Sequence, residues 1–269
     1  LLDRAGVSDI AGEGAGGGGG RGCQIDLALH MAHAAHKVAV GGGNAALALG
    51  QNAHVAAQAG AAGGGGDDAA RINEGSGPAA QDALLVNGHG GGDDDTCVVR
   101  KSNIERYAEE NCVMTVTAQA NDSFFMDTQY GYKYFTFLTE ELPKVIQTMF
   151  PSSPKREDNF VAGFSMGGYG AFKWAMHNPE KFRCCGVFSG PIGIVPHEPV
   201  HYKENEIGLR EDENEPCPEG FKTMIAAFGS AKDRRNTPDD NFYMIEQHLK
   251  KHTDLPEFYI STGQEDAIA

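Results

Sequence analysis

The sequence predicts an α/β fold, a mostly parallel β-sheet with helices on both faces. Three observations carry this prediction. Apolar runs of strand length alternate with segments whose apolar residues recur at helical spacing, as in parallel sheets joined by crossover helices. The pentapeptide Gly163-Phe164-Ser165-Met166-Gly167 lies between one such strand and one such helix. The length of 269 residues suits a single domain of this class.

The strands are predicted by short apolar runs that glycine, proline or polar residues interrupt. In chain order they are 83–86, 113–118, 159–162, 183–188 and 258–260. In the fourth strand, the adjacent Cys184 and Cys185 should point to opposite faces of the sheet, because side chains alternate along a strand.

Two helices are predicted before the pentapeptide. Ser102 and Glu105 have the spacing of a capping box, in which the serine accepts from the N–H of the glutamate, so we expect a helix from here to about Glu110. Residues 135–149 have helical spacing, and Pro143 should kink this helix or restart it.

Two more helices follow the pentapeptide. The first spans 168–176 and ends before Pro179, because the residue before a proline disfavours helical geometry. The second is capped by Asp239 or Asp240, whose carboxylates suit a helix start. It should bury Phe242, Ile245 and Leu249.

The first eighty residues have an unusual composition. Glycine runs at 16–20, 41–43 and 63–66 alternate with alanine-rich stretches that carry few large side chains. Such a segment buries too little apolar area to offset its chain entropy, which would make it a flexible tail. We favour the other interpretation, that these letters stand for poorly determined side chains, because glycine and alanine are the residues written where a side chain is not seen. We therefore divide the chain into residues 1–80, containing the first strands, and a core over 81–269.

Ser165 is the candidate nucleophile. Gly-x-Ser-x-Gly between a strand and a helix is the pattern of a nucleophile elbow, a sharp and strained turn that exposes the serine hydroxyl. The flanking glycines leave room for the close approach of strand and helix. The alternative is an incidental serine between glycines, but the order strand, serine, helix favours catalysis.

A wider set of residues resembles the putative-esterase (esterase D-like) branch of the α/β-hydrolases. The segments that carry the resemblance are 100–108, 130–134, 140–143 and 163–171. Within that branch the chain looks most similar to bacterial tributyrin or acetyl esterases, with feruloyl esterases and S-formylglutathione hydrolases as relatives. The resemblance implies an α/β-hydrolase fold with a lid inserted around residues 191–238.

Ester hydrolysis passes through a tetrahedral oxyanion, which needs hydrogen-bond donors. The backbone N–H of Met166 is the first candidate, because the residue after the elbow serine donates in this geometry. The loop His89-Gly90-Gly91 resembles the family's His-Gly-x loop, which implies Gly91 as the second donor and Gly90 as a substrate contact. The alternative for this loop is a plain tight turn.

Asp266 is the candidate acid of the triad. It stands in Gly263-Gln264-Glu265-Asp266, which is similar to the family's Gly-x-x-Asp after a late strand; a surface aspartate is the alternative. The chain order in this fold is nucleophile, acid, histidine, yet every histidine of the sequence precedes Asp266. We expect the catalytic histidine beyond residue 269, so that the sequence stops before it. A catalytically incomplete protein is the alternative.

An aromatic cluster follows the strand at 113–118. Its members are Phe124, Phe125, Tyr130, Tyr132, Tyr134 and Phe135. One interpretation is that they line an ester-binding pocket, with Tyr130 as a substrate contact. The other is that they pack in the core beneath the next helix, and the sequence favours neither.

Charge and composition exclude several partners. A formal net charge of −15 argues against nucleic acids and anionic membranes, and no apolar run is long enough to span a bilayer. The six cysteines have no metal-ligand spacing, and Asp93 to Asp95 look like a solvated turn, so we expect no metal and no cofactor. Cysteines interpreted as free thiols, and no signal peptide at the start of the given sequence, favour the cytoplasm. Homo-oligomerisation stays open.

The sequence therefore predicts a serine carboxylesterase that hydrolyses small acyl esters through an acyl-enzyme intermediate. Two alternatives stay open. One is an acyltransferase, in which an alcohol replaces water as the acceptor, and the other is a pseudo-hydrolase that uses its cleft for binding.

Overall fold

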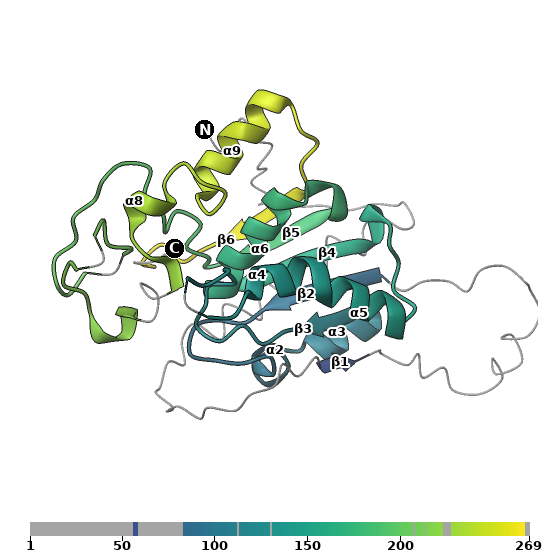
Figure 1. The fold of residues 1–269 in the computed structure, drawn as a ribbon. Helices are drawn as coiled ribbons and strands as arrows, with labels where there is room; N and C mark the ends of the chain where they lie inside the picture. The colour runs from purple at the N-terminus through teal and green to yellow at the C-terminus, as the bar shows by residue number, and fades with distance from the viewer. Residues whose placement is uncertain are drawn as a thin grey trace, which may run out of the picture.

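The computed structural model describes residues 56–58, 83–111, 113–129, 131–206, 208–212, 214–222 and 227–266. Six strands of this part form one sheet in the order β1-β3-β2-β4-β5-β6 (Figure 1). They are β1 Ala56–Gln58, β2 Ala83–Gly88, β3 Val113–Thr117, β4 Asn159–Phe164, β5 Cys184–Phe188 and β6 Glu257–Ser261. β1 pairs antiparallel with β3, and the other pairs are parallel. The predicted mostly parallel sheet is confirmed.

Helices pack on both faces of the sheet, as predicted. One face carries α4 Tyr134–Thr136, the π-helical η3 Phe137–Glu141, α5 Leu142–Met149, α6 Met166–His177 and α9 Asn241–Lys251. The other face carries α2 Cys97–Lys101 and α3 Ile104–Glu110. The alternation of side chains along the strands divides the core accordingly. Cys185 belongs to the first face and Cys184 to the second, as expected for neighbours in a strand.

Pro143 restarts a helix, as predicted. It has no backbone N–H to donate to the carbonyl of Thr139 four residues earlier, and the π-helical turn η3 ends directly before α5 begins. The Nζ atom of Lys181 donates to the Thr139 carbonyl oxygen at 3.3 Å. A side chain from another part of the chain thus replaces the missing helical donor.

The capping box predicted at Ser102 differs from the structure. The Ser102 hydroxyl accepts from the N–H of Ile104 at 3.2 Å, instead of from the N–H of Glu105. The same hydroxyl donates to the carbonyl oxygen of Val98 at 2.5 Å, within the last turn of α2. Ser102 therefore joins the end of α2 to the start of α3, a role that the local pattern does not reveal.

The last helix begins where predicted, and two of its three predicted core residues are confirmed, since Ile245 is buried and Leu249 packs against the core. The carboxylate of Asp240 caps α9 by accepting from the N–H of Tyr243 at 3.1 Å. Phe242, predicted to be buried, is 37% exposed. The inward position belongs to its neighbour Asn241, whose side-chain amide donates to the carbonyl of Ile192 at 3.1 Å.

The segment 191–238 packs against α6 through a small core of its own, around Tyr169 and Phe228. It includes the short helix α8 Ala231–Arg234. Within the segment, the buried guanidinium of Arg210 donates to four main-chain carbonyls, those of Lys203, Glu206, Gly208 and Pro216. Carbonyl dipoles, rather than a carboxylate, solvate this charge in the described part of the chain.

Most of residues 1–80 lies outside the described part, and so does most of the prediction that they contain the first strands. The exception is β1, which adds to the main sheet beside β3. Among the residues that the structure describes, no helix is long and apolar enough to cross a membrane.

Candidate active site

The parallel strands bring the predicted site residues to one edge of the sheet. Gly88 is in register with Gly163, Phe164 with Phe188, and Phe188 with Ser261. The loops after β2, β4, β5 and β6 therefore leave the sheet at the same edge, where open α/β sheets bind ligands. These loops contain Gly90, Gly91, Ser165, Ser189 and Asp266.

Ser165 occupies a strained turn between β4 and α6. Its φ of 53° and ψ of −117° lie in a region that residues with side chains rarely adopt. The Ser165 N–H donates to the carbonyl of Phe188 at 2.8 Å, and the Ser165 carbonyl accepts from the N–H of Gly168 at 2.9 Å. The strained residue is therefore anchored to β5 on one side and to the first turn of α6 on the other.

The glycines around Ser165 are required by backbone contacts. A Cβ atom on Gly163 would lie 2.1 Å from the carbonyl oxygen of Gly167, and one on Gly167 would lie 2.2 Å from the carbonyl oxygen of Gly88. Both clashes are with backbone atoms, which cannot rotate away as a side chain can. The start of α6 thus touches β2 and β4 backbone to backbone.

The two predicted oxyanion donors differ in their surroundings. Met166 is the first residue of α6, so its N–H has no helical acceptor. In the glycine loop, a Cβ on Gly90 would lie 3.6 Å from the Cβ of Ser165, so this loop passes beside the serine. No acceptor in the described part of the chain bonds the N–H of Gly91. Both amides are therefore unused within that part.

The N–H of Gly92 has a partner that the sequence does not suggest. It donates to the carboxylate of Asp122 at 2.6 Å. Asp122 lies in the loop after β3, thirty residues further along the chain, and no local pattern connects the two positions.

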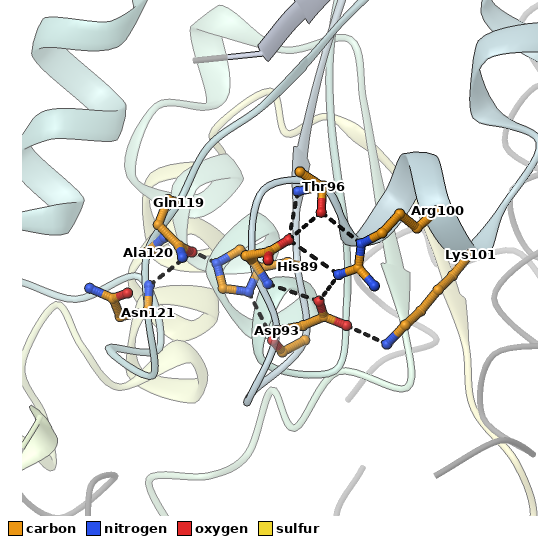
Figure 2. Close-up of polar contacts among 10 residues, drawn as sticks. His89, Asp93, Thr96, Arg100, Lys101, Gln119, Ala120 and Asn121 are labelled. Carbon is orange, nitrogen blue, oxygen red and sulfur yellow. Dashed lines mark hydrogen bonds and ion pairs between the residues drawn. The ribbon is translucent and has the colours of Figure 1, made fainter. Parts of the chain in front are cut away.

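A charged cluster fixes the end of the glycine loop. Asp93 accepts from Arg100 and Lys101 of α2 (Figure 2). Burial raises the pKa of Asp93, but hydrogen bonds from Lys101 and Cys97 outweigh it and hold this pKa well below its usual range. The side chain of Asp93 is 12% exposed, so the interpretation of this turn as solvated is wrong for Asp93. The ion pairs instead fasten the loop to α2.

The aromatic residues after β3 belong mostly to the core. Phe125 is buried, and the ring of Phe124 packs edge-on against Tyr169 at a centroid distance of 6.1 Å. Tyr132 is 67% exposed. Tyr130, the predicted substrate contact, lies outside the described residues.

Asp266 follows β6 in a turn closed by its N–H, which donates to the carbonyl of Gly263 at 3.2 Å. β6 lies beside β5, which lies beside β4, the strand directly before Ser165. No described histidine hydrogen-bonds to the Ser165 hydroxyl. His177 and His248 bond to main-chain carbonyl oxygens instead.

The described residues contain no group of three or more histidine, cysteine, aspartate or glutamate side chains arranged to hold a metal ion. Burial, together with a hydrogen bond to Asp93, raises the pKa of the Cys97 thiol to about 11. This thiol is therefore protonated at neutral pH and is a poor nucleophile.

Comparisons with known proteins identify the family of the chain. The family described as putative esterase matches residues 96–267. S-formylglutathione hydrolase of Mus musculus is 43% identical over 59 residues, which are 22% of this chain and 20% of that protein. Acetyl esterase of Caldicellulosiruptor saccharolyticus is 23% identical over 148 residues, 55% of this chain and 52% of that protein. The chain thus spans about half, or less, of the length of these relatives.

Solved structures show the same fold. The substrate-bound fluorophosphonate-binding serine hydrolase F of Staphylococcus aureus matches with a TM-score of 0.54 and 24% identity, over 72% of this chain and 69% of that one. An S-formylglutathione hydrolase from Agrobacterium tumefaciens matches with a TM-score of 0.52 and 20% identity, over 70% and 68%. The predicted α/β-hydrolase fold is thereby confirmed.

Proposed function

The chain belongs to the putative-esterase family, and we propose that it is a serine carboxylesterase that hydrolyses small acyl esters. The observation that carries the proposal is the strained turn at Ser165, with a φ of 53°, between a parallel strand and a helix. A strained turn at this place supports a nucleophile elbow, which would present the serine hydroxyl for attack.

In the proposed reaction the Ser165 oxygen attacks the carbonyl carbon of the ester while its proton passes to a histidine. The N–H groups of Met166 and Gly91 stabilise the oxyanion of the tetrahedral intermediate. Collapse of this intermediate breaks the bond to the alcohol, which leaves with the proton from the histidine. Water then attacks the acyl-enzyme in the same way and releases the acid.

Asp266 is proposed to orient the histidine. It is at the same edge of the sheet as Ser165, two strands away, which supports this role. Since the acid precedes the histidine in this fold, we place the base C-terminal to Asp266. An imidazole bonded to both groups would set the Ser165 hydroxyl about 7–8 Å from the nearer carboxylate oxygen, from two hydrogen bonds and a ring.

Two further roles and a cellular location also belong to the proposal. The segment 191–238 acts as a lid, which is supported by its packing against Tyr169 on the helix that begins after Ser165. Gly90 and Tyr130 contact the substrate, and the position of Gly90 beside the serine supports the first of these contacts. The protein works in the cytoplasm.

Ser165→Ala tests the proposal. We expect it to lower kcat for p-nitrophenyl acetate by about 10⁴- to 10⁶-fold, as in other serine hydrolases that lose the nucleophile. Ser189→Ala is a matched control, because Ser189 follows the neighbouring strand and also has a positive φ, 45°. A fluorophosphonate probe should label the wild type and the control. Labelling of Ser165→Ala at an undiminished rate would refute the assignment.

A further inference from the structure

The imidazole of His89 is held between two backbone groups beneath the glycine loop. The residue is 2% exposed. Its Nε2 atom lies 3.0 Å from the nitrogen of Ala120 (Figure 2). Its Nδ1 atom lies 2.8 Å from the carbonyl oxygen of Gly90. The ring also packs against that of Phe125, with centroids 5.6 Å apart.

These two contacts select one form of the ring. The N–H of Ala120 can only donate, so Nε2 of His89 must have a free lone pair and accept. The carbonyl oxygen of Gly90 can only accept, so Nδ1 must carry the proton. His89 is therefore a neutral imidazole with its proton on Nδ1.

The hydrogen bond to Gly90 also determines the direction in which the N–H of Gly91 points. The carbonyl of Gly90 and the N–H of Gly91 belong to the same planar peptide, and the described peptides contain no cis bond. In a trans peptide these two groups point in opposite directions. By holding the Gly90 carbonyl, His89 turns the N–H of Gly91 away from the ring. Two glycines impose little restriction of their own on this peptide.

We propose that His89 is a positioning residue for the oxyanion hole, because its Nδ1–H sets the direction in which the Gly91 N–H points. This inference rests on the proposed function, in which that N–H is a donor. Without the bond, the peptide between the two glycines would rotate, and the donor would lose the fixed orientation on which oxyanion stabilisation depends. The bond from Ala120 keeps the ring itself in place by tying it to the segment after β3.

Two substitutions separate the two hydrogen bonds of the ring. In His89→Asn the side-chain amide nitrogen takes the position of Nδ1 and donates to the carbonyl oxygen of Gly90. In His89→Gln the side-chain amide oxygen takes the position of Nε2 and accepts from the N–H of Ala120. We expect kcat to fall by about 10- to 100-fold in the glutamine variant, short of the roughly 10²–10³ for removing a donor outright. KM should change little, and the asparagine variant should keep most of the activity. Equal kcat in the two variants would overturn the proposal.

A second measurement does not depend on turnover. In ¹⁵N NMR spectra of the wild-type protein, we expect the His89 ring to be protonated on Nδ1 and unprotonated on Nε2. The amide resonance of Gly91 should shift more in His89→Gln than in His89→Asn. A proton on Nε2, or a Gly91 resonance unchanged in the glutamine variant, would overturn the proposal at any level of activity.

The same data keep this inference distinct from the proposed function. If Ser165→Ala hydrolyses esters as fast as the wild type, the proposed function is wrong. If the His89 ring is then still protonated on Nδ1 and the Gly91 resonance still responds, the orienting contact stands and only its catalytic purpose is lost.

Discussion

Helix α6 makes two different kinds of contact on two of its sides, close backbone contacts on one and side-chain hydrogen bonds on the other. Toward the sheet, the first turn comes so close that Gly167 meets Gly88 backbone to backbone. On another side, Tyr169, Lys173 and His177 recur every four residues and form a polar stripe that bonds to the end of the segment 191–238 and the residues directly after it.

The polar stripe is centred on Asp239. Lys173, which is 2% exposed, donates to the Asp239 carboxylate at 2.6 Å, and Arg234 donates to the same carboxylate at 2.7 Å. The Tyr169 hydroxyl donates to the main-chain oxygen of Asp239 at 2.8 Å. The contact between Gly167 and Gly88 therefore requires that Gly167 has no side chain, because a Cβ atom there would clash with the backbone of β2. The stripe depends on paired groups and fails when one partner is removed.

Adding one methyl group to the sheet side should have the largest effect. In Gly167→Ala the new Cβ would lie 2.2 Å from the Gly88 carbonyl oxygen and 2.3 Å from its carbon. We expect a loss beyond the usual overpacking cost of about 1–3 kcal/mol, enough to prevent folding. In the control Gly193→Ala, the new Cβ meets the outer end of the Phe242 ring at 2.8 Å, and this side chain is 37% exposed and can rotate away, so a loss of at most about 1–3 kcal/mol is expected. Circular dichroism shows whether Gly167→Ala folds, and urea unfolding measures the stability of each variant that does; equal losses in the two variants would break the comparison.

Removing one partner from the stripe should come next. Asp239→Ala leaves the buried ammonium of Lys173 without its carboxylate, which should cost about 3–5 kcal/mol of the free energy of unfolding. Lys173→Met removes the buried charge itself and leaves Asp239 paired with Arg234, so its cost should be clearly smaller. Urea unfolding of both variants decides the order. A larger loss for Lys173→Met would show that the stripe is held by packing.

The stripe should also weaken in acid. Burial raises the pKa of Asp239, but the attraction of Lys173 and Arg234 outweighs it and lowers this pKa below the usual range of an aspartate. A carboxylate with a lowered pKa in the folded state contributes stability above about pH 4, and this contribution is lost as the pH falls below that value. The double variant Lys173→Met/Asp239→Asn lacks this group. Between pH 5 and pH 3, its free energy of unfolding should fall less than that of the wild type, and parallel curves would exclude Asp239 as the cause.

Deleting one hydroxyl should have the smallest effect. Tyr169→Phe removes the hydrogen bond to the Asp239 main-chain oxygen and should cost about 0.5–1.5 kcal/mol. Tyr132→Phe, at an exposed position, serves as the control and should leave stability unchanged. Thermal unfolding resolves this difference, and no loss in Tyr169→Phe would mean that water replaces the hydroxyl at no cost.

The same contrast explains what the sequence could predict. β4, α6 and the cap at Asp240 follow from apolar runs, helix ends and capping residues, all of which are local signals. The sheet-side contact was also predictable, because the glycines around Ser165 are part of the motif. The pairing of Lys173 with Asp239 was not, since it joins positions 66 residues apart and either residue alone looks like a surface charge.

At the candidate site, the motif and the strand ends led to Ser165, to the glycine loop beside it and to the strand before Asp266. The anchors of the glycine loop could not be found in this way. Three consecutive aspartates look solvated until the fold brings α2 against them, and Asp93 becomes part of an ion-pair cluster. The ring of His89 is oriented by Ala120, 31 residues away, so its tautomer follows from tertiary structure alone.

The hydrogen bonds of Arg210 determine how the loop 203–216, within the segment 191–238, unfolds locally. One guanidinium bonds to four carbonyls that are spread from Lys203 to Pro216. No single carbonyl can leave without weakening the solvation of a charge that the other three still surround. The loop should therefore open in one cooperative step, and its amide protons should exchange with a common free energy of opening. Fraying residue by residue is therefore disfavoured in this loop, which should behave as a single two-state unit.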